Sequence, residues 1–181
     1  MTGAYTAWHQ RNLAEKYEAL IADPSASSEA AARNLRRRAR NGAPIGRLRI
    51  GRLGLDVIVV AGTDSQSLRM GPGWDDRTAL PGEHELVYVA GHRTTYLAPF
   101  ANIDRLRRGD RIVFSTPYAT FTYVVSGHRI VESDDLSVLR SPGREVLRLQ
   151  ACHPRFFASK RYVVEAEPAG QTSGRRGRIS A

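Results

Sequence analysis

The sequence predicts an all-β domain, a barrel or a sandwich of short strands, preceded by a helical N-terminal extension. After Pro44, runs rich in Val, Ile, Leu, Tyr and Thr alternate with Gly, Pro and Asp, a pattern typical of strands joined by turns. Few helical segments separate these runs, which disfavours a parallel α/β sheet. With 181 residues, the chain has the length of one domain and can bury a core without disulfides or metals.

Two helices are expected before the strands. Apolar residues recur at helical spacing between Tyr5 and Ala22, and the following DPSASS ends the helical pattern. A second helix is expected in SEAAARNLRRRAR, residues 28–40, and NGAP closes it. We therefore expect residues 1–44 to form a helical stalk. The apolar positions of the first helix are Leu13, Tyr17, Leu20 and Ile21.

Seven segments are predicted as strands, with turn signals such as RRGD and TPYA between them. They are RLRIGRL (47–53), LDVIVVAG (55–62), ELVYVAGH (85–92), DRIVFST (110–116), ATFTYVVSGHRIV (119–131), EVLRLQAC (145–152) and RYVVEAE (161–167). Within this region, only TYLAPFANIDRL (95–106) is expected to form a helix or turn. Residues 169–181 have little to bury, and we expect a disordered basic tail.

The basic residues are concentrated at the two ends of the chain. Lys and Arg outnumber Asp and Glu by 27 to 18, and residues 1–47 hold eight basic residues against four acidic ones. Residues 48–168 are nearly balanced, with 16 basic and 14 acidic residues, so we expect no nucleic-acid partner. The basic cluster within residues 29–40 is interpreted either as a solvated linker helix or as a contact with an anionic membrane surface or wall polymer.

Cys152, the only cysteine, ends a predicted strand, because Pro154 follows it closely. A single cysteine cannot close an internal disulfide. From the residues alone, it is either a small buried apolar residue or a nucleophile. His92 ends a second predicted strand, and Arg161 begins the last one. A nucleophilic thiolate needs a neighbouring imidazole or cation and a positive donor for an oxyanion, which these residues supply if the fold brings them together.

The other histidines are less favoured as partners of Cys152. His153 is its neighbour on an extended strand and faces the opposite way, and His9, His84 and His128 belong to other predicted segments. A zinc site built from Cys152, His153, His92 and His128 would lack any CxxC or HxxxH pair. We therefore expect no metal and no cofactor.

The segment LRLQACHPRFFASKRYVVEA resembles the cysteine motif of sortases, transpeptidases of Gram-positive surfaces, in which Thr-Leu-x-Thr-Cys precedes an arginine on the next strand. Its Cys-His-Pro-Arg-Phe continuation is most similar to the actinobacterial class E group. Upstream, residues 47–114 resemble the opening strands of that family, with its Gly-Pro-Gly and Leu-Pro-Gly turns and its Ala-Gly-His-Arg motif. The resemblance extends over about residues 44–167.

The resemblance implies a closed eight-stranded sortase β-barrel in residues 45–168, with short helical insertions. It also implies that Cys152 is the nucleophile, His92 the general acid and base, and Arg161 the cation that positions the oxyanion or the substrate. It assigns no further substrate-binding residue.

The activity implied is cleavage of an LPxTG or LAxTG sorting signal between Thr and Gly, followed by acyl transfer to a cell-wall amine, with hydrolysis as a side reaction. The implied partners are surface proteins with a C-terminal sorting signal and a cell-wall precursor. The implied location is the extracytoplasmic face of the cell membrane.

Three departures from the family pattern support a second hypothesis, a peptide-binding barrel with weak or no catalytic activity. Arg148 and Ala151 stand where the motif has threonines. The usual N-terminal membrane span is also missing, since no apolar run reaches its roughly 20 residues and the N-terminus lacks a secretory signal. As written, the chain is expected to be soluble, and its first helix resembles the stalk that follows such a span.

Overall fold

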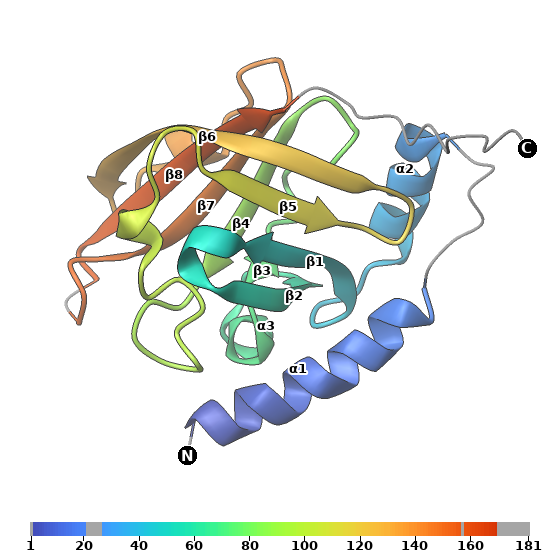
Figure 1. The fold of residues 1–181 in the computed structure, drawn as a ribbon, viewed down its shortest axis with the longest axis horizontal. Coiled ribbons are helices and arrows are strands. Elements are labelled where there is room, and N and C mark those ends of the chain that lie inside the picture. The colour runs from blue at the N-terminus through green and yellow to red at the C-terminus, as the bar shows by residue number, and fades with distance from the viewer. Residues whose placement is uncertain (1, 21–26, 157, 170–181) are drawn as a thin grey trace, which may run out of the picture.

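The computed structural model describes residues 2–20, 27–156 and 158–169, and eight strands close into a barrel (Figure 1). The predicted all-β barrel with short helical insertions and an N-terminal helical extension is confirmed. The strands are β1 (Pro44–Ile50), β2 (Leu55–Ala61), β3 (Gly73–Trp74), β4 (Leu86–Gly91), β5 (Arg111–Ser115), β6 (Thr120–Glu132), β7 (Val146–His153) and β8 (Lys160–Pro168). Their order around the barrel is β1-β2-β3-β4-β7-β8-β6-β5, and β5 pairs with β1.

Helices α1 (Thr2–Glu18) and α2 (Ser28–Arg38) precede the barrel, and the short helix α3 (Ser65–Met70) follows β2. α2 begins as predicted, because the Ser27 side chain caps it by accepting a hydrogen bond from the Ala30 amide. The described part of the chain also contains the 3-10 helices η1 (Gly51–Leu53), η2 (Ile103–Arg105) and η3 (Leu136–Leu139). The predicted helix or turn at residues 95–106 contains η2.

Three elements, β3, α3 and η3, were not predicted, and one strand ends earlier than expected. Within the barrel region, a helix or turn was expected only at residues 95–106. β3 has only two residues, which is too short for an alternating pattern. α3 follows Asp64, whose carboxylate accepts hydrogen bonds from the Gln66 and Ser67 amides. The prediction of a strand over residues 47–53 was wrong at its end, because the chain turns into η1 after β1 and Gly54 adopts a left-handed conformation with φ of 59°.

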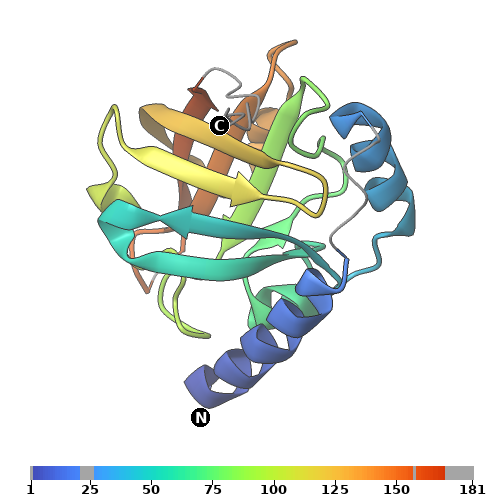
Figure 2. The same cartoon turned by 45° about the vertical axis from the view of Figure 1, so that its right-hand side comes forward.

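α1 lies against the barrel wall, across β2 and beside α3 (Figures 1 and 2). Its Leu13 and Tyr17, both predicted on the apolar face, are buried against Ile58 and Val60 of β2. The helical extension therefore contacts the outside of the barrel through an apolar cluster of its own, separate from the main core.

The end of α1 differs from the prediction. Leu20 was expected on the apolar face, but it is 44% exposed because the helix ends at Glu18. Ile21, Ala22 and most of the predicted basic tail lie outside the described residues. Among the helices that the structure describes, none is both long enough and apolar enough to cross a membrane.

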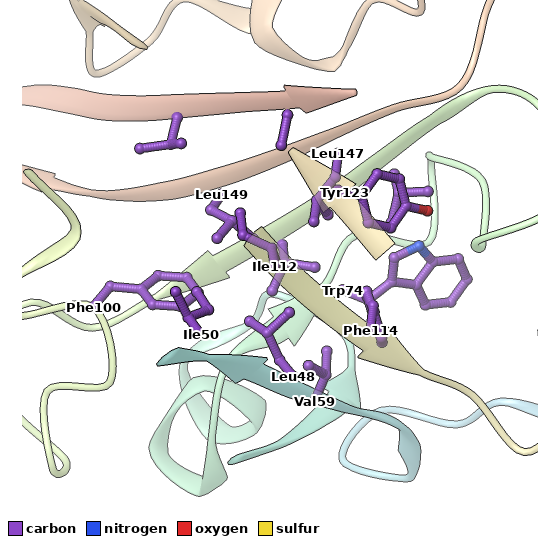
Figure 3. Packing of buried hydrophobic residues seen from close by; sticks show 14 of the residues in the cluster. Leu48, Ile50, Val59, Trp74, Phe100, Ile112, Phe114, Tyr123, Leu147 and Leu149 are labelled. Atoms are coloured by element: carbon purple, nitrogen blue, oxygen red, sulfur yellow. The ribbon is translucent and has the colours of Figure 1, made fainter. Parts of the chain in front are cut away.

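The barrel core consists of side chains that point inward from opposite walls (Figure 3). Leu48 of β1, Phe114 of β5 and Leu149 of β7 are all fully buried there. Because side chains alternate along a strand, the neighbours of the inward residues on β7 point out of the barrel. This alternation sends Cys152 to the outer face, while Ala151 lies in the core.

Candidate active site

Cys152, His92 and Arg161 line one pocket of about 300 Å³ on the outer face of the barrel. Strand pairing explains why they meet. β4 and β7 run parallel, with Gly91 opposite Ala151, so the next residue of each strand, His92 and Cys152, lies at the same end. β7 and β8 are antiparallel, and Cys152 pairs directly with Arg161.

His92 is held by the loop that follows it. The Phe100 amide donates a hydrogen bond to the His92 carbonyl at 3.0 Å. The Phe100 ring packs so closely on Gly91 that a Cβ there would lie 2.5 Å from its Cδ2 atom, which explains why a glycine precedes the histidine. The Tyr96 ring lies 5.0 Å from the imidazole, centroid to centroid.

The environment of His92 favours the neutral imidazole. Burial, and then the positive charge of Arg69, lower the pKa of His92 below its ordinary value. Arg69 lies nearby because its guanidinium carbon is 5.8 Å from the centroid of the Tyr96 ring, which in turn contacts His92. A neutral imidazole can accept a proton from a thiol or an amine.

The thiol of Cys152 is free and half-buried. Arg161, its cross-strand partner, donates hydrogen bonds to the carbonyls of Ala158 at 2.7 Å and Lys160 at 3.0 Å. Within the described residues, no carboxylate lies within ion-pair distance of Arg161. The guanidinium charge is therefore available to a negatively charged group in the pocket.

Arg93, which follows His92, was not singled out from the sequence, although its side chain is only 3% exposed. Its Nη1 lies 3.3 Å from the Cys152 carbonyl oxygen and 2.9 Å from Nδ1 of His153. Its Nη2 forms an ion pair with Asp104 at 2.7 Å. Arg93 therefore links the loop after His92 to the backbone of the cysteine.

The remaining histidines lie elsewhere. Because arginine only donates, Nδ1 of His153 accepts from Arg93, and the ring turns toward Tyr162 at 5.9 Å between centroids. His128 stacks on the same tyrosine at 5.5 Å. Among the described residues, no group of three or more His, Cys, Asp or Glu side chains is arranged to hold a metal ion.

The pocket also contains polar residues that were not predicted, among them Asp75, Tyr88 and Gln150. The buried Asp75 carboxylate accepts hydrogen bonds from Arg77 at 2.9 and 2.7 Å. Burial raises the pKa of Asp75, but the hydrogen bonds and charge of Arg77 outweigh it and lower the pKa overall. The Tyr88 hydroxyl donates to Gln150, which precedes Cys152 by two positions and therefore shares its face.

The two positions that depart from the family motif have different surroundings. Ala151 is fully buried in the main hydrophobic cluster, on the opposite face of β7 from Cys152. The hydroxyl of a threonine at this position would point into the barrel, away from the pocket. Arg148 lies on the same face as Cys152 and is buried beneath the segment that connects β6 and β7.

Comparison with known proteins agrees with this architecture. A family model described as the sortase domain matches residues 48–169. Sortase D of Bacillus subtilis (strain 168) is 31% identical over 123 residues, which are 66% of this chain and 61% of that protein. Sortase A of Bacillus anthracis is 27% identical over 127 residues, 70% of this chain and 60% of that protein. The match thus spans about three fifths of these relatives.

Solved structures of several sortase classes share the fold. The Clostridium perfringens Sortase D5 transpeptidase has a TM-score of 0.78 at 25% identity and covers 90% of this chain and 99% of its own. Sortase E of Streptomyces avermitilis has a TM-score of 0.64 at 31% identity, with coverages of 72% and 91%. Sortase E1 of Streptomyces coelicolor, solved with a tripeptide in the active site, has a TM-score of 0.66 at 26% identity, with coverages of 73% and 91%.

The two Streptomyces structures support the resemblance to class E, while the Sortase D5 structure covers a larger part of the chain. Since the family model covers well over half of the sequence and agrees with the barrel and its strand order, the chain belongs to the sortase family.

Proposed function

We propose that the chain is a cysteine transpeptidase that cleaves a C-terminal LPxTG or LAxTG sorting signal between Thr and Gly and transfers the acyl group to a cell-wall amine. The main support is the meeting of Cys152, His92 and Arg161 around one pocket in a chain of the sortase family. The partners would be surface proteins with such a signal and a cell-wall precursor, at the extracytoplasmic face of the membrane.

In the first half-reaction, the Cys152 sulfur attacks the carbonyl carbon of the Thr–Gly bond while its proton passes to the neutral His92 imidazole. Arg161 donates hydrogen bonds to the oxyanion of the resulting tetrahedral intermediate. The intermediate collapses as the carbon–nitrogen bond breaks, and His92 gives its proton to the departing glycine amine. The products are a thioester on Cys152 and a free amine.

In the second half-reaction, the acceptor amine attacks the thioester carbonyl and loses a proton to His92. Arg161 again stabilises the oxyanion. The carbon–sulfur bond then breaks, the new amide leaves, and the sulfur recovers its proton from His92. When water replaces the amine, the same steps give a carboxylic acid, which is the hydrolytic side reaction.

Purified protein is incubated with a peptide carrying the sorting signal and a glycine-based amine, and ligated product is measured by mass spectrometry. We expect product from the wild type and none from Cys152→Ala. Two matched pairs of variants test the roles of His92 and Arg161. They are His92→Gln against His128→Gln, and Arg161→Gln against Arg129→Gln, because His128 and Arg129 lie outside the pocket. Equal yields from wild type and Cys152→Ala would refute the proposal.

The alternative hypothesis, a peptide-binding barrel without catalysis, predicts a different result. Both wild type and Cys152→Ala would bind the peptide with the same affinity, and neither would form product. A second experiment measures the rate at which a thiol-specific reagent modifies Cys152 at several pH values. Under the alternative hypothesis, this rate would lack the pH dependence that a neighbouring imidazole gives.

A further inference from the structure

We propose that Arg148 is a positioning residue that fixes one wall of the peptide-binding pocket. This wall, residues 136–140, is the part of the connection between β6 and β7 that contains η3. The inference rests on the proposed function only in naming a peptide as the ligand. It concerns one of the two positions at which the chain departs from a threonine of the sortase motif.

Arg148 connects three parts of the fold through one guanidinium group. Its Nε pairs with the carboxylate of Glu165, its cross-strand partner on β8, at 2.8 Å. Its Nη1 donates to the carbonyl oxygens of Val138 at 2.8 Å and Arg140 at 2.9 Å. The arginine side chain is only 8% exposed, so water does not replace these donors easily.

The wall forms part of the pocket that contains Cys152. Leu136, Val138 and Leu139 all line it. Val138 packs with Tyr88, Ala90 and Val163 in a small apolar cluster on the outside of the barrel. The wall is therefore held on one side by this cluster and on the other by the two hydrogen bonds from Arg148.

The hydrogen bonds and the ion pair of Arg148 with described residues go to Glu165, Val138 and Arg140 and not to the three candidate catalytic residues, so its effect on a reaction would pass through the wall. A shorter side chain cannot hold both loop carbonyls and the Glu165 carboxylate at once. Without those donors, the wall samples positions in which Leu136 and Leu139 no longer face the peptide. Peptide binding should weaken, while the chemistry at the thiol should continue.

The test compares Arg148→Met, which keeps the length of the side chain but removes its donors, with Arg144→Gln. The control is matched because Arg144, two residues before β7, forms an exposed pair with Glu167 of β8 and does not line the pocket. We expect Arg148→Met to raise the peptide KM roughly tenfold with kcat nearly unchanged. The rate at which a small reagent alkylates Cys152 should also stay at the wild-type value.

Arg148→Lys, which keeps one charged donor, should give an intermediate KM. If Arg148→Met folds poorly, the comparison is made with Arg148→Lys instead. An unchanged KM in both variants, or equal losses in kcat and in alkylation rate, would overturn the assignment, since equal losses indicate general damage to the fold.

Hydrogen exchange without substrate separates this inference from the proposed function. We expect the amides of residues 136–141 to exchange faster in Arg148→Met than in wild type or Arg144→Gln. Unchanged exchange refutes the role of Arg148 even if the enzyme is active. Faster exchange in a protein that forms no product supports the anchoring of the wall and counts against the transpeptidase function alone.

Discussion

At the scale of single residues, Arg93 determines where the backbone of Cys152 lies relative to the loop after His92. The contact to the Cys152 carbonyl comes from a nearly buried guanidinium that also binds His153 and Asp104. These contacts use Nη1 and Nη2, while the buried Nε has no hydrogen-bond partner among the described residues. The position of the nucleophile therefore depends on a residue that does not line the pocket.

We expect Arg93→Gln to lower kcat by about ten- to a hundredfold, because small displacements of reacting groups have effects of that size. KM for the peptide should change little. Arg93→Lys keeps the charge but cannot make all the contacts, so it should restore part of the rate. The measurement is steady-state transpeptidation together with the pH profile of Cys152 alkylation.

Arg155→Gln is the matched control for Arg93, because Arg155 also pairs with Asp104, at 3.6 Å, but its hydrogen bonds to described residues go to Ala101 and Asn102 and not to Cys152. It should retain wild-type kcat. A loss of thermal stability in Arg93→Gln with an unchanged rate and pH profile would show that Arg93 acts only in folding.

The charge of Arg69 sets part of the pH dependence of the site. Burial and Arg69 both lower the pKa of His92. Arg69→Gln should therefore raise this pKa toward its ordinary value, and the acid limb of the rate should move to higher pH. Arg69→Lys keeps a positive charge and should leave both close to wild type. An NMR titration of the His92 ring measures the shift directly, and equal titrations in wild type and Arg69→Gln would contradict this reasoning.

The same shift has a consequence for stability. Because the folded protein binds a proton at His92 less readily than the unfolded chain does, protonation favours unfolding. The contribution of His92 to stability is complete above the unfolded pKa of about 6.5 and falls as the pH drops through it. Arg69→Gln should make this loss at acid pH smaller.

The sequence predicted those pocket residues that stand at the end of an apolar run. It did not predict the pocket residues whose position depends on how the strands pair. Cys152 and His92 were recognisable because apolar runs stop at each of them. Asp75 and Tyr88 enter the pocket through the register of β3 with β4, for which no local pattern exists. Ala151 precedes the nucleophile in the sequence, but its side chain lies in the core, on the other face of β7.

At the scale of elements, α1 is fixed to the barrel by one glutamine as well as by its apolar face. Gln10 accepts a hydrogen bond from the Ile58 amide at 2.7 Å and donates to the Ile58 carbonyl at 3.0 Å. It also donates to the Met70 carbonyl at 2.8 Å. The side chain thus joins α1 to β2 and to the end of α3.

We expect Gln10→Ala to lower the free energy of unfolding by about 1 to 3 kcal/mol, because it leaves backbone groups without their partners. Urea denaturation measures the change. Glu15→Ala alters an exposed side chain of the same helix and should have little effect. If both variants unfold at the same urea concentration as wild type, the glutamine contacts do not hold the helix.

Elements with a strong local pattern were predicted, and elements without one were not. The seven predicted strands overlap β1, β2 and β4 to β8, because alternation and flanking turns mark each of them. β3 has no such pattern. It pairs in parallel with β2, so the paired residues are not joined by a tight turn that the sequence could reveal. The parallel contact of β4 with β7, on which the pocket depends, also requires the complete topology.

At the scale of the whole molecule, α2 carries a cluster of positively charged side chains. Two of its arginines have carboxylate partners: Arg33 pairs with Glu29, and Arg36 pairs with Glu83. Arg37 and Arg38 are exposed, and no carboxylate of the described residues lies within ion-pair distance of either. This end of the molecule therefore carries an uncompensated positive charge.

We expect this charge to bind anionic lipid surfaces. Each Arg close to such a surface contributes about 1 kcal/mol, so Arg37→Gln with Arg38→Gln should weaken binding to phosphatidylserine-containing vesicles about thirtyfold. The interaction should also fall as ionic strength rises, since exposed charges are screened. Vesicle sedimentation at two salt concentrations measures both effects.

The control for α2 is the pair Arg107→Gln and Arg108→Gln, which removes the same charge from the exposed turn before β5. If net charge alone governed binding, both double variants would lose the same affinity. If the position of the charges on α2 matters, only the double variant at Arg37 and Arg38 should lose affinity. Because α2 leads directly into β1, a membrane contact at α2 would hold the barrel within a few residues of the surface. Equal losses in the two double variants would show that the contact is nonspecific and has no fixed orientation.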